Sequence, residues 1–270
     1  MLAVERLGPQ DLVSVVVYDD EARVLVPATP AGDKARILRA IRGIRSGGST
    51  ALFAGVALGA AEVRRFGRER QVKRVILLSD GLANVGPDSP SELGRLGASL
   101  RKEGISVSTI GLGLGYNEDL MARLAFNSDG NHAFVQEPRD LARIFDAEFL
   151  DAASVVASEV DITVTCAEGV RPVRIMNRDG DIRGREVRVS LNQILGAREK
   201  YVLVELDLEG GRSGGSRPVA EAQVSYLDLA SLERSVLRSS VAVTYSSDEG
   251  AVRLGLRRDV KEQVVLQLAT

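Results

Sequence analysis

The run Val75-Ile76-Leu77-Leu78-Ser79-Asp80-Gly81 decides the fold of this 270-residue chain. Its first four residues are all apolar, which is typical of a strand buried on both faces in a parallel sheet that helices cover. The run breaks sharply at Ser79-Asp80-Gly81, so we expect Asp80 directly after the end of the strand. In open α/β sheets, ligands bind at this carboxyl edge.

The segments before and after this strand alternate between strand-like and helical patterns. We expect strands at residues 12–18, 23–26, 75–78, 105–110 and 133–136, and helices at 33–44, 50–66, 91–102, 119–126 and 139–156. Strands that alternate with helices indicate βαβ units and a mostly parallel sheet with helices on both faces.

The pattern changes after about residue 158. Six strand-like runs follow, separated by glycine-rich or charged turns, at residues 160–167, 170–177, 187–191, 201–208, 219–226 and 236–245. No helical pattern interrupts them until roughly Asp259. The sequence therefore predicts an α/β domain at residues 1–157, an all-β, sandwich-like domain at 158–258, and the start of a C-terminal helix at 259–270.

Composition excludes several classes of partner. The 35 Lys and Arg residues nearly balance 37 Asp and Glu residues, so no basic footprint for nucleic acid is present. No run approaches 18 apolar residues, so no membrane-spanning segment is expected. The single cysteine, Cys166, cannot form an intrachain disulfide, and we expect it in the core.

Two residues are candidate metal ligands. Asp80 follows the buried strand, and Thr50 ends the turn Gly47-Gly48-Ser49-Thr50 that opens a helix. A hydroxyl and a carboxylate are hard oxygen ligands, which suit Mg²⁺ and suit zinc poorly. Two ligands are too few for a firm site, and each residue also has an ordinary structural interpretation as a helix or turn cap. The residues expected on the ligand-binding surface beside this site are Ser49, Gly81 and Asn84.

We predict no catalytic and no cofactor-binding residue. A hydrolase on this layout is disfavoured because His132 is the only histidine and no Gly-x-Ser-x-Gly motif is present. The glycines 111, 113 and 115 depart from the dinucleotide-binding spacing by one position, so they are interpreted as turn residues.

Four segments together resemble a bacterial von Willebrand factor type A domain over roughly residues 1–155. They are Leu7–Asp19, Gly47–Leu52, Val75–Gly86 and Thr109–Gly113. The rest of the chain resembles the β-rich region that follows this domain in some bacterial members. In the family, an Asp-x-Ser-x-Ser loop, a threonine and an aspartate form a metal-ion-dependent adhesion site. Thr50 matches the threonine and Asp80 the last aspartate, whereas the Asp-x-Ser-x-Ser loop has no counterpart.

The resemblance also implies that a strand is missing. The family's first strand is central and lies between the strands equivalent to Leu12–Tyr18 and Val75–Leu78. Without it, about four large apolar side chains lose their contacts, at a cost of roughly 6–12 kcal/mol. A whole domain is stable by only about 5–15 kcal/mol. We therefore expect that the chain is not the complete natural folding unit.

The resemblance implies a non-catalytic protein-binding module. In the full-length form, an acidic residue of a protein ligand would complete the coordination of Mg²⁺ at the site of Thr50 and Asp80, whereas this chain alone would bind Mg²⁺ weakly or not at all. The alternative is a metal-independent scaffold or interaction protein with a degraded site. Family members with this layout favour an exported or membrane-anchored location over a cytoplasmic one.

Overall fold

The computed structural model describes residues 1–45, 47–66 and 71–268. It divides the chain into two compact units, Met1–Ser158 and Glu159–Thr270. None of the described helices is long and apolar enough to cross a membrane.

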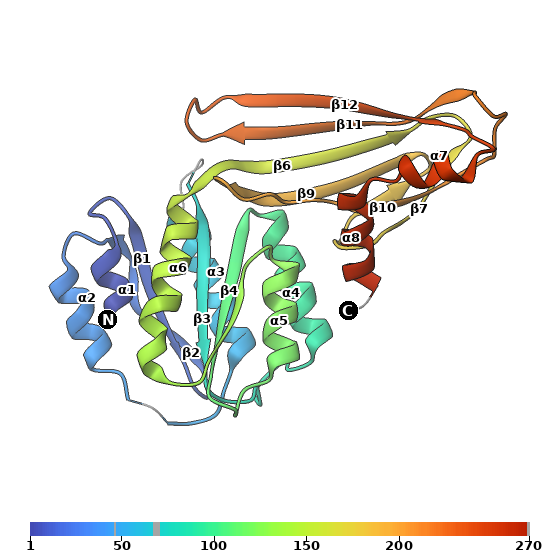
Figure 1. Ribbon diagram of the computed structural model, residues 1–270. Coiled ribbons are helices and arrows are strands. Elements are labelled where there is room, and N and C mark those ends of the chain that lie inside the picture. The colour runs from blue at the N-terminus through green and yellow to red at the C-terminus, as the bar shows by residue number, and fades with distance from the viewer. Residues whose placement is uncertain (46, 67–70, 269–270) are drawn as a thin grey trace. The chain divides into compact units, whose positions relative to one another are not determined.

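The first unit contains a parallel sheet of three strands in the order β3-β4-β5 (Figure 1). These strands are β3 (Lys73–Ser79), β4 (Ile105–Leu112) and β5 (His132–Val135). The register pairs Ser79 with Gly111 and Leu112 with Val135, so all three strands end at the same carboxyl edge.

Helices cover both faces of this sheet, as the apolar run of β3 predicts. One face packs against α3 (Leu52–Phe66), α4 (Pro90–Lys102) and α5 (Glu118–Asn127). These elements share a buried core, which consists of Leu52, Val56, Ala60, Leu77, Leu93, Leu100, Ile105, Val107, Leu120, Met121 and Leu124. The opposite face meets α6 (Leu141–Ala153), whose buried Glu148 accepts hydrogen bonds from Arg74 on β3 and Ser108 on β4.

A hairpin forms a second, separate sheet in this unit. It pairs β1 (Leu12–Tyr18) with β2 (Ala22–Pro30) in antiparallel register. Two helices, α1 (Leu2–Arg6) and α2 (Lys34–Arg42), accompany the hairpin. Its core contains Val4, Val26 and Ile37.

Among the described residues, side-chain hydrogen bonds join the hairpin to β3 and to α3, and no strand pairing joins it to β3. The Tyr18 hydroxyl of β1 donates to the carbonyl oxygen of Leu78. Glu62 of α3 is buried and accepts the Ala28 amide of β2 at 2.9 Å. The strands β1 and β3 lie in different sheets. The predicted α/β layout, a parallel sheet with helices on both faces, is confirmed.

The small residues of α3 let this helix lie close to the hairpin. A Cβ atom on Gly55 would lie 2.7 Å from Cδ1 of Tyr18, closer than real atoms approach. Glycine at this position therefore permits the Tyr18 ring to pack beneath α3.

The second unit has the sandwich-like layout expected from its strand pattern. A five-stranded sheet has the order β12-β11-β6-β9-β8, and a two-stranded sheet pairs β10 with β7. Side chains of both sheets share one core cluster with Cys166, which is buried. The strands are β6 (Val155–Cys166), β7 (Val170–Ile175), β8 (Asp181–Arg183), β9 (Glu186–Leu195), β10 (Val204–Leu208), β11 (Ser216–Asp228) and β12 (Arg234–Thr244).

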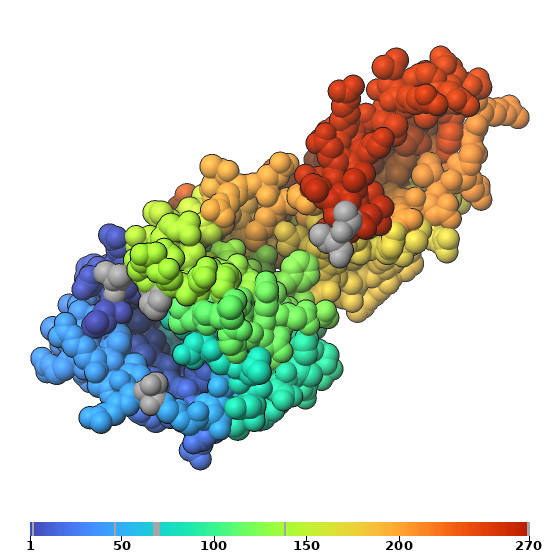
Figure 2. Space-filling view, turned by 60° about the horizontal axis from the view of Figure 1, so that its bottom comes forward, coloured from blue at the N-terminus to red at the C-terminus, as the bar shows by residue number. Residues whose placement is uncertain are grey.

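The end of the chain differs from the expectation. A helix, α7 (Glu249–Leu254), begins ten residues before the expected helix at Asp259. Its first turn is capped by Asp248, whose side chain accepts a hydrogen bond from the Gly250 amide at 2.8 Å. The final helix, α8, spans Arg258–Leu268, and the last two residues of its predicted range lie outside the described residues. Figure 2 shows this C-terminal segment (red) at the surface of the unit, and neither helix contains a buried residue.

Candidate functional site at the carboxyl edge of the sheet

The loop that carries Thr50 is fixed to the loop after β3. The Thr50 amide donates to Oδ1 of Asn84 at 2.7 Å. In return, the Asn84 amide donates to the Thr50 carbonyl oxygen at 3.3 Å. This reciprocal pair of hydrogen bonds fixes the loop that carries Thr50 to the loop that carries Asp80.

The turn between β1 and β2 supports the same loop from the other side. The Ala51 amide donates to the carbonyl oxygen of Asp19 at 2.8 Å. The Ser49 amide donates to Oδ1 of Asp20 at 2.9 Å. Hydrogen bonds from the Ser49 side chain and amide hold the pKa of the Asp20 carboxyl below its usual value. All three consecutive amides, from Ser49 to Ala51, are thus engaged.

The side-chain oxygens of the two candidate ligands are available to bind a ligand. Among the described residues, neither the Thr50 hydroxyl nor the Asp80 carboxylate has a hydrogen-bond or ion-pair partner. Asp80 is exposed and Thr50 is partly exposed. A Cβ on Gly81 would lie 3.1 Å from Oγ1 of Thr50, so Gly81 leaves the approach to this hydroxyl clear.

The loop after β4 forms the next part of the edge. A Cβ on Gly115 would lie 2.9 Å from the Asp80 carbonyl oxygen, so the two loops are in close contact. Leu114 in this loop is 90% exposed, and Leu82 beside Gly81 is 58% exposed. The candidate site is therefore bordered by large apolar side chains that face solvent.

A tyrosine lies beneath the site. Burial raises the pKa of Tyr18 to about 12, the hydrogen bond with the Ser79 side chain opposes the rise, and the negative charge of Asp80 adds to it. The phenol therefore stays neutral and acts as a hydrogen-bond donor to β3.

The structure brings Thr50, Gly81 and Asn84 together, and Asp80 directly precedes Gly81 in the chain. Ser49 supports the loop, because both its amide and its side chain bond to Asp20, and its place on the ligand-binding surface stays a prediction. No group of three or more His, Cys, Asp or Glu side chains suited to a metal ion occurs in the part of the chain that the structure describes. The described residues thus offer two open oxygen ligands, and their role in metal binding stays a prediction.

Histidine 132 has partners that suit a structural role. The Thr109 hydroxyl donates to the Met121 carbonyl oxygen at 3.1 Å, so it accepts a hydrogen bond from Nδ1–H of His132, 2.8 Å away. Nε2 then faces the Tyr116 hydroxyl at 3.4 Å. Burial lowers the pKa of His132. Among the described residues, the side-chain hydrogen-bond partners of His132 are Thr109 and Tyr116.

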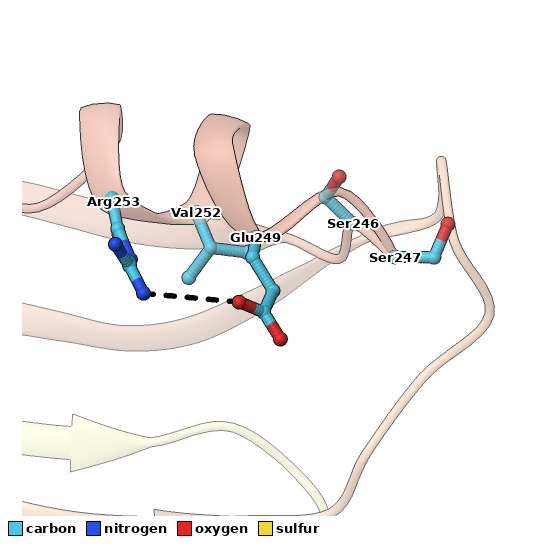
Figure 3. A pocket seen from close by; sticks show the side chains of 5 residues that line it. All are labelled: Ser246, Ser247, Glu249, Val252 and Arg253. Carbon is cyan, nitrogen blue, oxygen red and sulfur yellow. Dashed lines mark ion pairs between the residues drawn. The ribbon is translucent and has the colours of Figure 1, made fainter.

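A hollow of about 220 Å³ lies elsewhere, in the second unit. It is lined by Ser246, Ser247, Glu249, Val252 and Arg253. Figure 3 shows Glu249 and Arg253 pointing toward one another, with 3.8 Å between their charged atoms. This open hollow brings no convergent set of ligands together, so the sheet edge is the better candidate.

Sequence reasoning missed the supports of the site. Asp19 and Asp20 read as ordinary turn residues between two strands. The two adjacent aspartates in a hairpin turn are the only sequence feature that could have indicated this support. The fold is needed to show that the turn contacts the Thr50 loop.

Comparison with known proteins agrees with the fold. The family model of the von Willebrand factor type A domain matches residues 2–147. The uncharacterized protein YfbK of Escherichia coli K12 is 29% identical over 160 residues, which cover 59% of this chain and 28% of YfbK. The uncharacterized protein sll0103 of Synechocystis is 24% identical over 252 residues, which cover 89% of this chain and 59% of sll0103.

A solved structure matches both units. The von Willebrand factor type A protein from Catenulispora acidiphila has a TM-score of 0.81 at 15% identity and covers 96% of this chain. This chain in turn covers 63% of that protein, so it spans less than two thirds of each of these relatives. Because the family model matches more than half of the residues, the chain belongs to the von Willebrand factor type A domain family.

Proposed function

We propose that this chain is a non-catalytic protein-binding module whose carboxyl sheet edge binds a protein ligand through a divalent cation. The observation that carries this proposal is the contrast between the bonded backbone of the Thr50 loop and the unbonded side-chain oxygens of Thr50 and Asp80. The amides of Ser49, Thr50 and Ala51 are hydrogen-bonded, whereas the Thr50 hydroxyl and the Asp80 carboxylate have no partner among the described residues. Such pre-organised oxygen atoms suit Mg²⁺.

Two protein ligands do not hold Mg²⁺ firmly, because this ion prefers six oxygen atoms in octahedral geometry. Domains of this family often bind a divalent metal at their adhesion site. We propose that further oxygens come from outside the described residues, including an acidic side chain of the protein ligand. Alone, the chain then binds Mg²⁺ weakly.

The exposed leucines favour a protein ligand over a small one. Leu82 and Leu114 add apolar surface beside Asp80, and apolar surface next to a few polar groups is typical of protein interfaces. A location outside the cytoplasm stays a prediction from the family.

Capture of ligands from an extract of the source organism tests metal dependence. The immobilised protein, extended as in its relatives, should retain the same proteins in Mg²⁺ and lose them in EDTA. Asp80→Asn should lose them as well, whereas Asp88→Asn, which changes an exposed carboxylate of the same loop, should not. Capture that survives both EDTA and Asp80→Asn would favour the metal-independent scaffold instead.

A further inference from the structure

Strand β12 leaves one edge of the second unit open. It is the last strand of the five-stranded sheet and pairs only with β11 among the described strands (Figure 1). It has 11 residues, and all except Ser235 and Val243 are exposed. Natural sheets keep exposed edges short or heavily charged, because unpaired backbone groups attract another strand. A long open edge such as this one is suited to pairing.

Apolar side chains reach this edge on one face of the sheet. The register places Leu237 opposite Val224 of β11 and Val241 opposite Ala220. Leu237 is 58% exposed and Val241 is 53% exposed. On the same face, Val243 packs against the core of the unit, so the exposed pair continues the inner, apolar side of the sandwich.

We propose that β12 pairs with β12 of a second copy of this chain, antiparallel about a two-fold axis at Ser239. A residue that precedes Ser239 in one copy then lies opposite the residue that follows Ser239 by the same number of positions in the other copy. Leu237 of each copy meets Val241 of the other copy on the apolar face. The two five-stranded sheets become one continuous sheet, and the same surface is used by both copies.

The side chains select this register over its neighbours. A shift that keeps the same faces together must move the strand by two residues. Centring the pair on Arg238 would place two arginines directly opposite each other, which destabilises a sheet. Centring it on Ser240 would place Val241 opposite Ser239. Only the axis at Ser239 matches both apolar residues with each other.

The charge of Arg238 does not oppose this pairing. Its guanidinium donates to Oε1 of Gln223 at 2.9 Å and lies 4.0 Å from Glu221, both on its own β11. In the proposed register Arg238 faces Ser240 of the second copy. The opposite edge strand, β8, has only three residues, so pairing of β8 with β12 would leave most of β12 uncovered.

Sedimentation velocity over a range of concentrations tests the pairing. A single pair of strands makes a small interface, so we expect a reversible dimer with a dissociation constant on the order of 10 µM. Leu237→Lys and Val241→Glu, each alone, should raise this constant at least about ten-fold. The double variant should return it to within about three-fold of the wild type, because each introduced lysine then faces an introduced glutamate of the other copy.

Leu232→Lys is the matched control, because Leu232 is an exposed leucine just before β12 and should leave the dimer unchanged. Circular dichroism should show that all variants stay folded, since the altered side chains are exposed. A wild-type chain that stays monomeric at about 200 µM would overturn the proposal. A dimer that survives Leu237→Lys, or a double variant that is no better than the single ones, would also overturn it.

Discussion

Thr50 and Asn84 hold each other by two hydrogen bonds in opposite directions: the Thr50 amide donates to the Asn84 side chain, and the Asn84 amide donates to the Thr50 carbonyl oxygen. The Thr50 hydroxyl takes no part in this pair. The backbone of Thr50 therefore positions the loop, and its side chain remains available to a ligand.

Asn84→Ala removes the side-chain acceptor of the Thr50 amide. We expect the free energy of unfolding to fall by about 1 kcal/mol and the exchange protection of the Thr50 amide to fall at least about ten-fold. Amide exchange followed by NMR measures this. Asn127→Ala, which removes the bond from Nδ2 to the Gly94 carbonyl, should affect stability without changing Thr50. Equal protection of Thr50 in both variants would contradict the account.

Asp20 tests the pH dependence of the same loop. Because hydrogen bonds from Ser49 lower the pKa of Asp20 in the folded state, its contribution is present above the ordinary pKa and is lost as pH falls below about 4. The Ser49 amide resonance should therefore titrate in acid. Asp20→Asn keeps an acceptor and should keep the loop ordered, whereas Asp20→Ala should not. A loop that is equally ordered in both variants would show that the carboxylate does not support it.

Tyr18 tests the link between the hairpin and β3. Tyr18→Phe should lower the free energy of unfolding at pH 7 by about 1–2 kcal/mol, because the Leu78 carbonyl oxygen loses its donor. The folded pKa of about 12 lies above the ordinary value of 10, so the contribution of Tyr18 is full below pH 10 and is lost as pH rises toward 12. Denaturant melts should therefore show the two proteins converging over this range. A difference that stays constant up to pH 12 would argue against a buried, neutral phenol.

Glu148 tests the attachment of α6. Its ion pair with Arg74 is buried, and both side chains are only 7% exposed. Glu148→Ala leaves the Arg74 charge buried and unpaired, so we expect a loss of about 3–5 kcal/mol in denaturant melts. The exposed pair of Arg6 and Asp146 provides the comparison, and Arg6→Ala should cost less than about 1 kcal/mol. Similar losses of unfolding free energy in both variants would mean that burial does not determine how much an ion pair contributes to stability.

Periodicity predicts the layers of this molecule well, because each layer is encoded locally. The apolar run of β3 requires cover on both faces, and the structure supplies it from α3 and α6. The glycine at position 55 of α3 permits its close approach to Tyr18. The short α7 was missed, since a helix of six residues scarcely differs from a turn in sequence.

The site was predicted only in part, and the reason is physical. Thr50 and Asp80 follow recognisable elements, so their positions can be inferred from strand and helix ends. Asp20 binds the Ser49 amide across 29 residues of sequence, and no local pattern encodes such a contact. The same holds for Gly115, which meets Asp80 only because β3 and β4 end at one edge.

The most direct test of the proposed site is the broadening of amide resonances by Mn²⁺, which replaces Mg²⁺ and locates even weak binding. The account predicts that small amounts of Mn²⁺ broaden the amides of Ser49–Ala51 and Asp80–Asn84 first. This effect should vanish in Asp80→Asn and persist in Asp88→Asn. Broadening that is unchanged in Asp80→Asn, or centred elsewhere on the first unit, would contradict the assignment of Thr50 and Asp80 as metal ligands.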